Sequence, residues 1–193
     1  GLPEVEKTSY RLTNAKVISA AKDLYTLLPS LKKTLGIDLV PMGAISFKGD
    51  VMARGNNMDI KGLLSTALGS VTTLTTLKQI GTNALNYNST GAINGLEAGK
   101  LLTIKQLGKI AGKYSVSGNA KSGINFNANL SNLAFNDYNY TNINARGSYM
   151  NDVLETAVDI DDKNLIAVLS SRINLGGKMP TTIVDAQIHL SDL

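Results

Sequence analysis

Alternation of apolar and polar residues is the dominant pattern in this chain. In residues 124–130 every even position is apolar and every odd position is Asn. The same period of two runs through residues 45–54, 154–160, 165–175 and 184–190. A period of two places apolar side chains on one face of a strand and polar side chains on the other. We therefore expect a series of strands, each with one apolar face.

Turn-forming residues separate these runs, at 54–57, 118–119, 151–152, 161–164 and 176–177. Strands joined by short turns at this spacing are typical of an antiparallel meander. The fold class we predict is mostly β: a curved antiparallel sheet, shaped as a β-taco with a groove or as an open sandwich. One or two short helices cap it.

Two segments depart from the alternation and indicate those helices. Residues 19–35 have apolar positions at helical spacing, with Ser19 as N-cap and Pro29 kinking or dividing the helix. Residues 98–107 form the second predicted helix, which Gly108 ends. We divide the chain into an N-terminal strand or connection, 1–18, and a single β-rich domain, 19–193, and we expect it to be an excised piece of a longer chain.

Composition narrows the function further. The 193 residues include 43% hydrophobic residues, no Cys and one His, with a net charge of +4. Asn, Thr and Ser number 19, 16 and 15, whereas charged residues reach only 18%, below the usual quarter or so. A chain with this apolar content folds, and its uncharged polar surface favours a protein of the cell envelope.

Residues suited to catalysis or to metal binding are scarce. His189 is predicted to lie solvated on the polar side of its strand, and no nucleophile motif or phosphate-binding glycine loop is present. Residues 159–164 resemble a calcium loop but lack its Gly and its final Glu, so a hairpin turn is the preferred interpretation. Tyr138, Tyr140 and Tyr149 are expected to pack on a sheet with their hydroxyls in water. We predict no enzyme, no catalytic residue, no metal, no cofactor and no nucleic-acid partner.

Several short segments, in order along the chain, carry a resemblance to a known family. They are 24–32 with its central proline, 43–49, 64–71, 91–93, 97–102, 107–110, 116–118, 136–143, Gly147, 162–164 and 179–180. Together they resemble the C-terminal region of the TamB family, in the form found in Bacteroidetes-like envelopes, within the wider AsmA-like, bridge-like lipid-transfer group. The chain departs from the family at Lys163, where Pro is common.

The resemblance implies a long β-taco whose apolar groove carries phospholipid acyl chains between the inner and outer membranes. It also implies residence in the periplasm of a Gram-negative bacterium, an inner-membrane anchor outside this chain, and a part in outer-membrane biogenesis and protein secretion. On the apolar alternation we assign the groove lining to Ile45, Phe47, Val51, Ile124, Phe126, Leu130, Val158, Ile160, Ile188 and Leu190.

Three alternatives stay open at this point. The same residues could form a closed core under the helices rather than a groove. The chain could instead be a translocation and assembly module whose edge strand pairs with an outer-membrane barrel protein or a client protein. It could also be a ligand-free structural β-sandwich.

Overall fold

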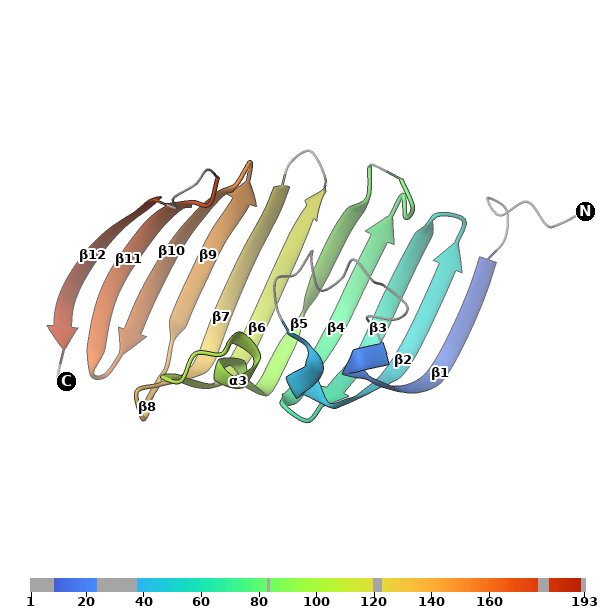
Figure 1. Cartoon of the computed structure of the whole chain (residues 1–193), viewed down its shortest axis with the longest axis horizontal. Coiled ribbons are helices and arrows are strands. Elements are labelled where there is room, and N and C mark those ends of the chain that lie inside the picture. Colours follow the sequence, from blue (N-terminus) through green and yellow to red (C-terminus); the bar gives the residue numbers. More distant parts are fainter. Residues whose placement is uncertain (1–8, 24–37, 83, 120–122, 177–180, 192–193) are drawn as a thin grey trace, which may run out of the picture.

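The computed structural model describes residues 9–23, 38–82, 84–119, 123–176 and 181–191. Within them the chain forms one open antiparallel sheet of 12 strands that is not closed into a barrel (Figure 1). The strands are β1 (Ser9–Ala20), β2 (Ala44–Arg54), β3 (Asn57–Thr66), β4 (Gly69–Lys78), β5 (Asn86–Glu97), β6 (Leu107–Asn119), β7 (Gly123–Phe135), β8 (Tyr138–Tyr140), β9 (Ile143–Met150), β10 (Val153–Asp162), β11 (Leu165–Asn174) and β12 (Thr181–Ser191).

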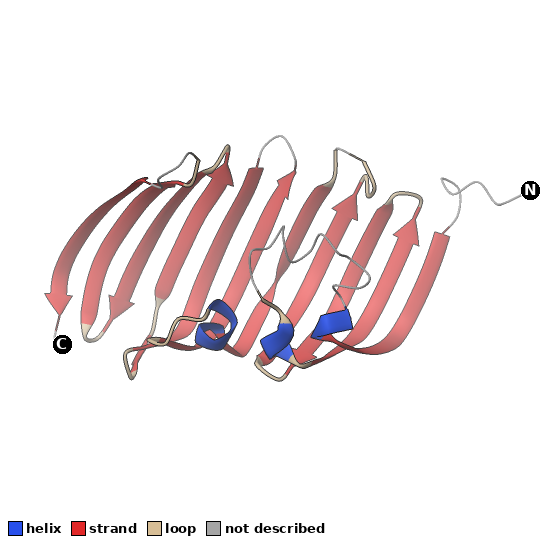
Figure 2. Cartoon of the chain, in the orientation of Figure 1, coloured by secondary structure: helices blue, strands red, loops and turns tan. Residues whose placement is uncertain are grey.

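The strand order follows the chain. Each strand pairs with the next from β1 to β7, β7 then pairs with β9, and the order continues to β12; the short β8 pairs with β7. The predicted curved sheet and antiparallel meander are therefore confirmed. The described strands form a single layer, so no second sheet among them packs against either face (Figure 2).

Short helical elements lie in front of one end of the strands in Figures 1 and 2. Among them are η2 (Val40–Met42), a 3-10 helix, and α3 (Ala98–Leu102). The helix α3 contacts both β6 and η2. It ends earlier than predicted because Thr103 adopts a left-handed conformation and donates its backbone N–H to the Gly99 carbonyl.

The other predicted helix was wrong at its start. Ser19 is not an N-cap but lies in β1, opposite Ile45, and the helical residues begin at Ala21. Strand pairing with β2 holds residues 9–20 extended, and the Asp23 carboxylate accepts a hydrogen bond from the backbone N–H of Ala20. Residues 24–35 lie outside the described part of the chain. The predicted domain boundary between residues 18 and 19 falls inside β1.

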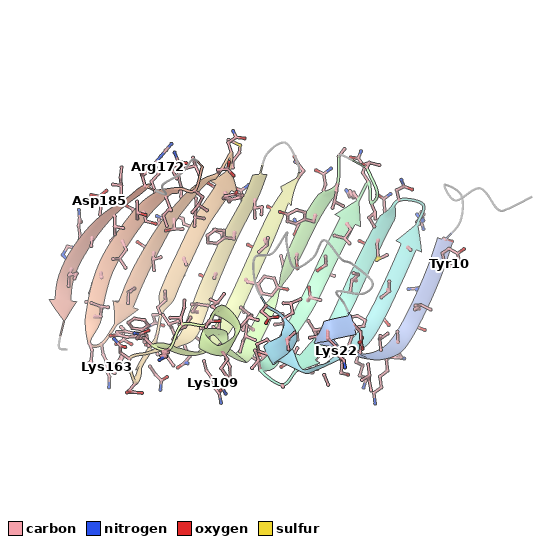
Figure 3. All side chains as sticks on the ribbon, in the orientation of Figure 1. Tyr10, Lys22, Lys109, Lys163, Arg172 and Asp185 are labelled. Atoms are coloured by element: carbon pink, nitrogen blue, oxygen red, sulfur yellow. The ribbon has the colours of Figure 1, made fainter. Side chains whose placement is uncertain are left out.

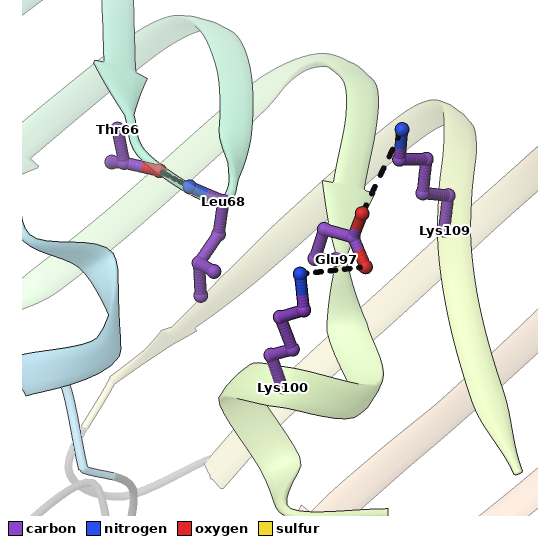
Figure 4. A network of polar contacts seen from close by, with 5 residues as sticks. All are labelled: Thr66, Leu68, Glu97, Lys100 and Lys109. Atoms are coloured by element: carbon purple, nitrogen blue, oxygen red, sulfur yellow. Dashed lines mark hydrogen bonds and ion pairs between the residues drawn. The ribbon is translucent and has the colours of Figure 1, made fainter. Parts of the chain in front are cut away.

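Few of the described side chains are fully buried, and two of them, Ala21 and Ala98, belong to helical residues at one end of the strands. The buried apolar residues among those described are Ala21, Ile45, Leu68, Ala98, Ile143 and Ala167. Figure 4 shows part of this end, where the Glu97 carboxylate lies 3.7 Å from the Lys100 ammonium and 3.6 Å from that of Lys109. Most apolar side chains of the sheet remain in partial contact with water.

Candidate functional site

The strand register brings the predicted lining residues to one face. A row of directly opposed residues runs from Phe47 through Leu64, Val71, Ile93, Gly112, Leu130, Ile143, Ile160 and Ala167 to Ile188. It crosses ten strands, roughly 40 Å at about 4.8 Å between neighbours. Four of the ten predicted residues lie in this one row.

Five more predicted residues share the face because they differ by an even number of positions from a member of the row on the same strand. These are Ile45 and Val51 on β2, Ile124 and Phe126 on β7, and Val158 on β10. We call this side of the sheet the apolar face. The tenth residue, Leu190, lies in β12 opposite Ile166, beyond a register shift, and its side chain is outside the described part of the chain.

Sequence reasoning missed several members of the apolar face. Ile60 and Leu64 on β3, Val71 on β4 and Ile93 on β5 lie in register with the predicted residues. Their strands alternate in the sequence, but threonines and glycines interrupt the apolar positions. The signal that could have found them is the equal length of residues 57–66 and 69–78, which pair from Met58–Leu77 to Thr66–Gly69.

Aromatic rings lie over glycines of neighbouring strands on this face. A Cβ built on Gly62 would collide with the Phe47 ring, and one built on Gly147 would collide with the Phe126 ring. Tyr114 stands in the same relation to Gly91, and Tyr87 to Gly118. Each ring therefore covers a position that has no side chain of its own, and covering glycines in this way is a recognised means of stabilising sheets.

A cluster of hydroxyl groups interrupts the apolar face at β4, β5 and β6. The Thr75 hydroxyl lies 2.7 Å from that of Thr73 and 2.8 Å from that of Ser89. The Tyr114 hydroxyl donates to the Thr73 hydroxyl at 3.1 Å. Because these groups bond to one another, the cluster keeps polar atoms satisfied within an otherwise apolar surface.

The opposite side of the sheet, which we call the polar face, carries charged and amide side chains. Asn125, Asn127 and Asn129 lie there on β7, and Arg146 pairs with Asp159 at 2.7 Å while Arg172 pairs with Glu155. Figure 3 shows the side chains along all the strands, with Arg172 and Asp185 labelled near one end of the sheet. Shallow hollows lie between side-chain rows of this face, one of them bordered by Asn88, Ser117 and Asn125.

One carboxylate lies buried at the end of the sheet. Asp162 is 3% exposed, and its two oxygens accept hydrogen bonds from the Tyr138 hydroxyl, the Thr141 backbone and hydroxyl, and the Asn164 backbone, at 2.8–3.0 Å. Burial raises the pKa of Asp162, but these hydrogen bonds outweigh it and lower the pKa from 3.8 to about 2. The Asn164 bond closes the turn between β10 and β11, which confirms the hairpin interpretation of residues 159–164.

The tyrosine prediction was wrong in part. Tyr138 and Tyr140 contact edge to face with ring centroids 4.7 Å apart, but the Tyr138 hydroxyl donates to Asp162 and the Tyr149 hydroxyl to Asp152, rather than reaching only water. His189 is exposed on β12, as predicted. In the described ranges there is no group of three or more acidic, His or Cys residues placed to hold a metal ion.

The fold and this face define the class: an open single-layer antiparallel sheet with one face that is mainly apolar. No family model, curated protein or solved structure matches the chain. None of the described helices is both long enough and apolar enough to span a membrane. The resemblance to the TamB family therefore stays a prediction.

Proposed function

We propose that the apolar face binds phospholipid acyl chains and that the chain is a segment of a TamB-like protein carrying them across the periplasm between the inner and outer membranes. The observation that carries the proposal is the row of apolar residues from Phe47 to Ile188, broken only at Gly112, on an open sheet. Burying acyl methylenes there would stabilise the complex by about 0.8 kcal/mol per CH₂. Headgroups could stay in water at the rim of the sheet.

Adjacent leucines on β3 provide a matched test. Leu64 lies on the apolar face between Phe47 and Val71, whereas Leu63 lies on the polar face and is 38% exposed. Leu64→Lys places an ammonium in the proposed acyl path, and Leu63→Lys makes the same chemical change on the other side of the same strand. Both positions carry the same residue, so comparing the two variants separates the effect of the face from the effect of the substitution itself.

The measurement is the amount of phospholipid extracted per mole of chain purified from Gram-negative cells, followed by binding of a fluorescent acyl-chain probe. We expect Leu64→Lys to reduce both several-fold and Leu63→Lys to leave both unchanged, with circular dichroism confirming that each variant folds. Absence of phospholipid from the unaltered chain, together with equal probe binding by the two variants, would show that the apolar face does not carry acyl chains.

The two open edges favour a second candidate. Among the described strands, β1 and β12 each pair on one side only, so either could accept a strand of an outer-membrane barrel protein or of a client by β-augmentation. A photo-reactive residue placed at Ile183 on β12 would then crosslink to a barrel protein in cells. Crosslinking confined to other positions would exclude this edge as the binding strand.

A further inference from the structure

The hydroxyl groups on the apolar face are brought together by a ring that crosses a glycine. We call Thr73, Thr75, Ser89 and Tyr114 the hydroxyl cluster. The Tyr114 hydroxyl, from β6, donates to the Thr73 hydroxyl on β4, two strands away. Gly91 of β5 lies between them, directly opposite both, and a Cβ built there would come within 2.9 Å of the Tyr114 ring. The ring spans β5 because residue 91 has no side chain.

The hydroxyl cluster has more acceptors than donors. In the described part of the chain its oxygens make five contacts of 2.7–3.2 Å, and each contact joins two members of the cluster. The four hydroxyls bring four protons, so these contacts already use every proton. Each Thr or Ser oxygen has two lone pairs, so about half of the lone pairs stay free to accept. A ligand group that donates a hydrogen bond therefore fits the cluster, whereas one that only accepts must break a bond inside it.

Apolar residues surround the hydroxyl cluster on this face. Val71 and Leu77 lie on either side of it along β4. Across the sheet, Ile60 on β3 and Ala128 on β7 adjoin it. The four members of the cluster are half-buried and uncharged, so an ammonium group covered there would lack a counter-ion, which costs free energy. These surroundings fit an uncharged donor with hydrocarbon on both sides of it.

We propose that the hydroxyl cluster binds a hydroxyl group carried part-way along an acyl chain, and that hydroxylated acyl chains are the preferred ligands of the apolar face. This inference rests on the proposed function, because the acyl chain must lie on the apolar face for its hydroxyl to reach the cluster. The ligand hydroxyl donates to a free lone pair, and the hydrocarbon on both sides packs on the neighbouring apolar residues. An unsubstituted acyl chain covers the same lone pairs without supplying a donor.

Three fatty acids of equal length test the proposal on the whole chain: stearate, 12-hydroxystearate and 12-oxostearate. At one carbon they carry no oxygen, a donor, and an acceptor without a proton. The measurement is displacement of the fluorescent acyl-chain probe. Thr73→Val combined with Thr75→Val removes two of the four hydroxyls with little change of shape. Thr156→Val is the matched control, since the Thr156 hydroxyl bonds to that of Ser171 elsewhere on the apolar face.

We expect 12-hydroxystearate to displace the probe at a several-fold lower concentration than the other two acids, from the unaltered chain and from Thr156→Val. This advantage should disappear in the double variant, whose folding is checked by circular dichroism. If the double variant does not fold, Tyr114→Phe replaces it, because it removes one hydroxyl and keeps the ring over Gly91.

The outcomes separate this proposal from the proposed function. Equal displacement by the three acids would overturn the preference for hydroxylated chains and leave acyl-chain binding standing. Displacement by none of them would overturn both. An advantage that 12-oxostearate shares, or that persists in the folded double variant, would show that the hydroxyl cluster does not accept the ligand's hydrogen bond.

Discussion

The buried carboxylate of Asp162 offers a quantitative test of how this single-layer sheet is held at its end. Four donors from Tyr138, Thr141 and Asn164 bind its two oxygens, and each oxygen accepts two of them. In Asp162→Asn an amide NH₂ replaces one oxygen. The hydroxyl that bonded to this oxygen can turn and accept a hydrogen bond from the amide, but the backbone N–H beside it loses its acceptor. Leaving a buried donor unpaired costs about 1–3 kcal/mol, so we expect the free energy of unfolding to fall by about 1–3 kcal/mol at pH 7.

The pKa gives an independent prediction for the unaltered chain. The pKa of Asp162 lies at about 2 in the folded state against an ordinary value of 3.8. One pKa unit is worth about 1.4 kcal/mol, so the charged form contributes roughly 2 kcal/mol of stability. Because the folded pKa is lowered, this contribution is complete above pH 4 and is lost as the pH falls toward 2.

The assay is urea unfolding followed by circular dichroism, at pH 7 and at pH 2, for the unaltered chain and for Asp162→Asn. Because Asn does not titrate, the difference in stability between the two proteins should narrow by roughly 2 kcal/mol over this range. Tyr138→Phe removes one donor and keeps the carboxylate, so the difference in stability between this variant and the unaltered chain should narrow by less over the same pH range. A difference that stays constant between the two pH values would refute the assignment of the hydrogen bonds as the cause of the lowered pKa.

Two further predictions concern the faces of the sheet. Gly147→Ala places a Cβ against the Phe126 ring and the Glu155 carbonyl, so we expect it to lower the free energy of unfolding by about 1–3 kcal/mol, measured by thermal unfolding. This loss should be smaller in a Phe126→Ala background, and equal losses in both backgrounds would show that the ring does not cover Gly147. Arg146→Gln removes the exposed ion pair with Asp159, so we expect it to lower the free energy of unfolding by less than about 1 kcal/mol, and by less still in high salt. A larger loss that does not depend on salt would contradict a surface role for this ion pair.

Much of this architecture was predictable because strand alternation is a local property. The strands around residues 45–54, 124–130, 154–160 and 165–175 were found from a period of two alone. The helix predicted at 19–35 was wrong at its start, because pairing of β1 with β2 holds the backbone extended through Ala20. Propensity and spacing describe a segment in isolation, whereas the ladder that holds Ser19 opposite Ile45 comes from residues more than twenty positions away.

The ring-over-glycine pairs and the Asp162 cluster could not be derived in this way. Phe126 and Gly147 are 21 positions apart, and Tyr138 and Asp162 are 24 apart, so neither pair leaves a mark in a local pattern. Gly62 and Gly147 contribute no side chain of their own. In the sheet they are the positions over which a neighbouring ring lies.

By itself the sequence determined that this protein is built from strands with one apolar and one polar side, because side chains alternate along any extended chain. It also determined which residues of each strand share a side. Only the tertiary structure decided that those sides align in register as one continuous face of a single open layer, rather than closing as two packed sheets. That outcome depends on the order and register of backbone pairing between strands, which hydrogen bonds set over the whole molecule and no single strand encodes.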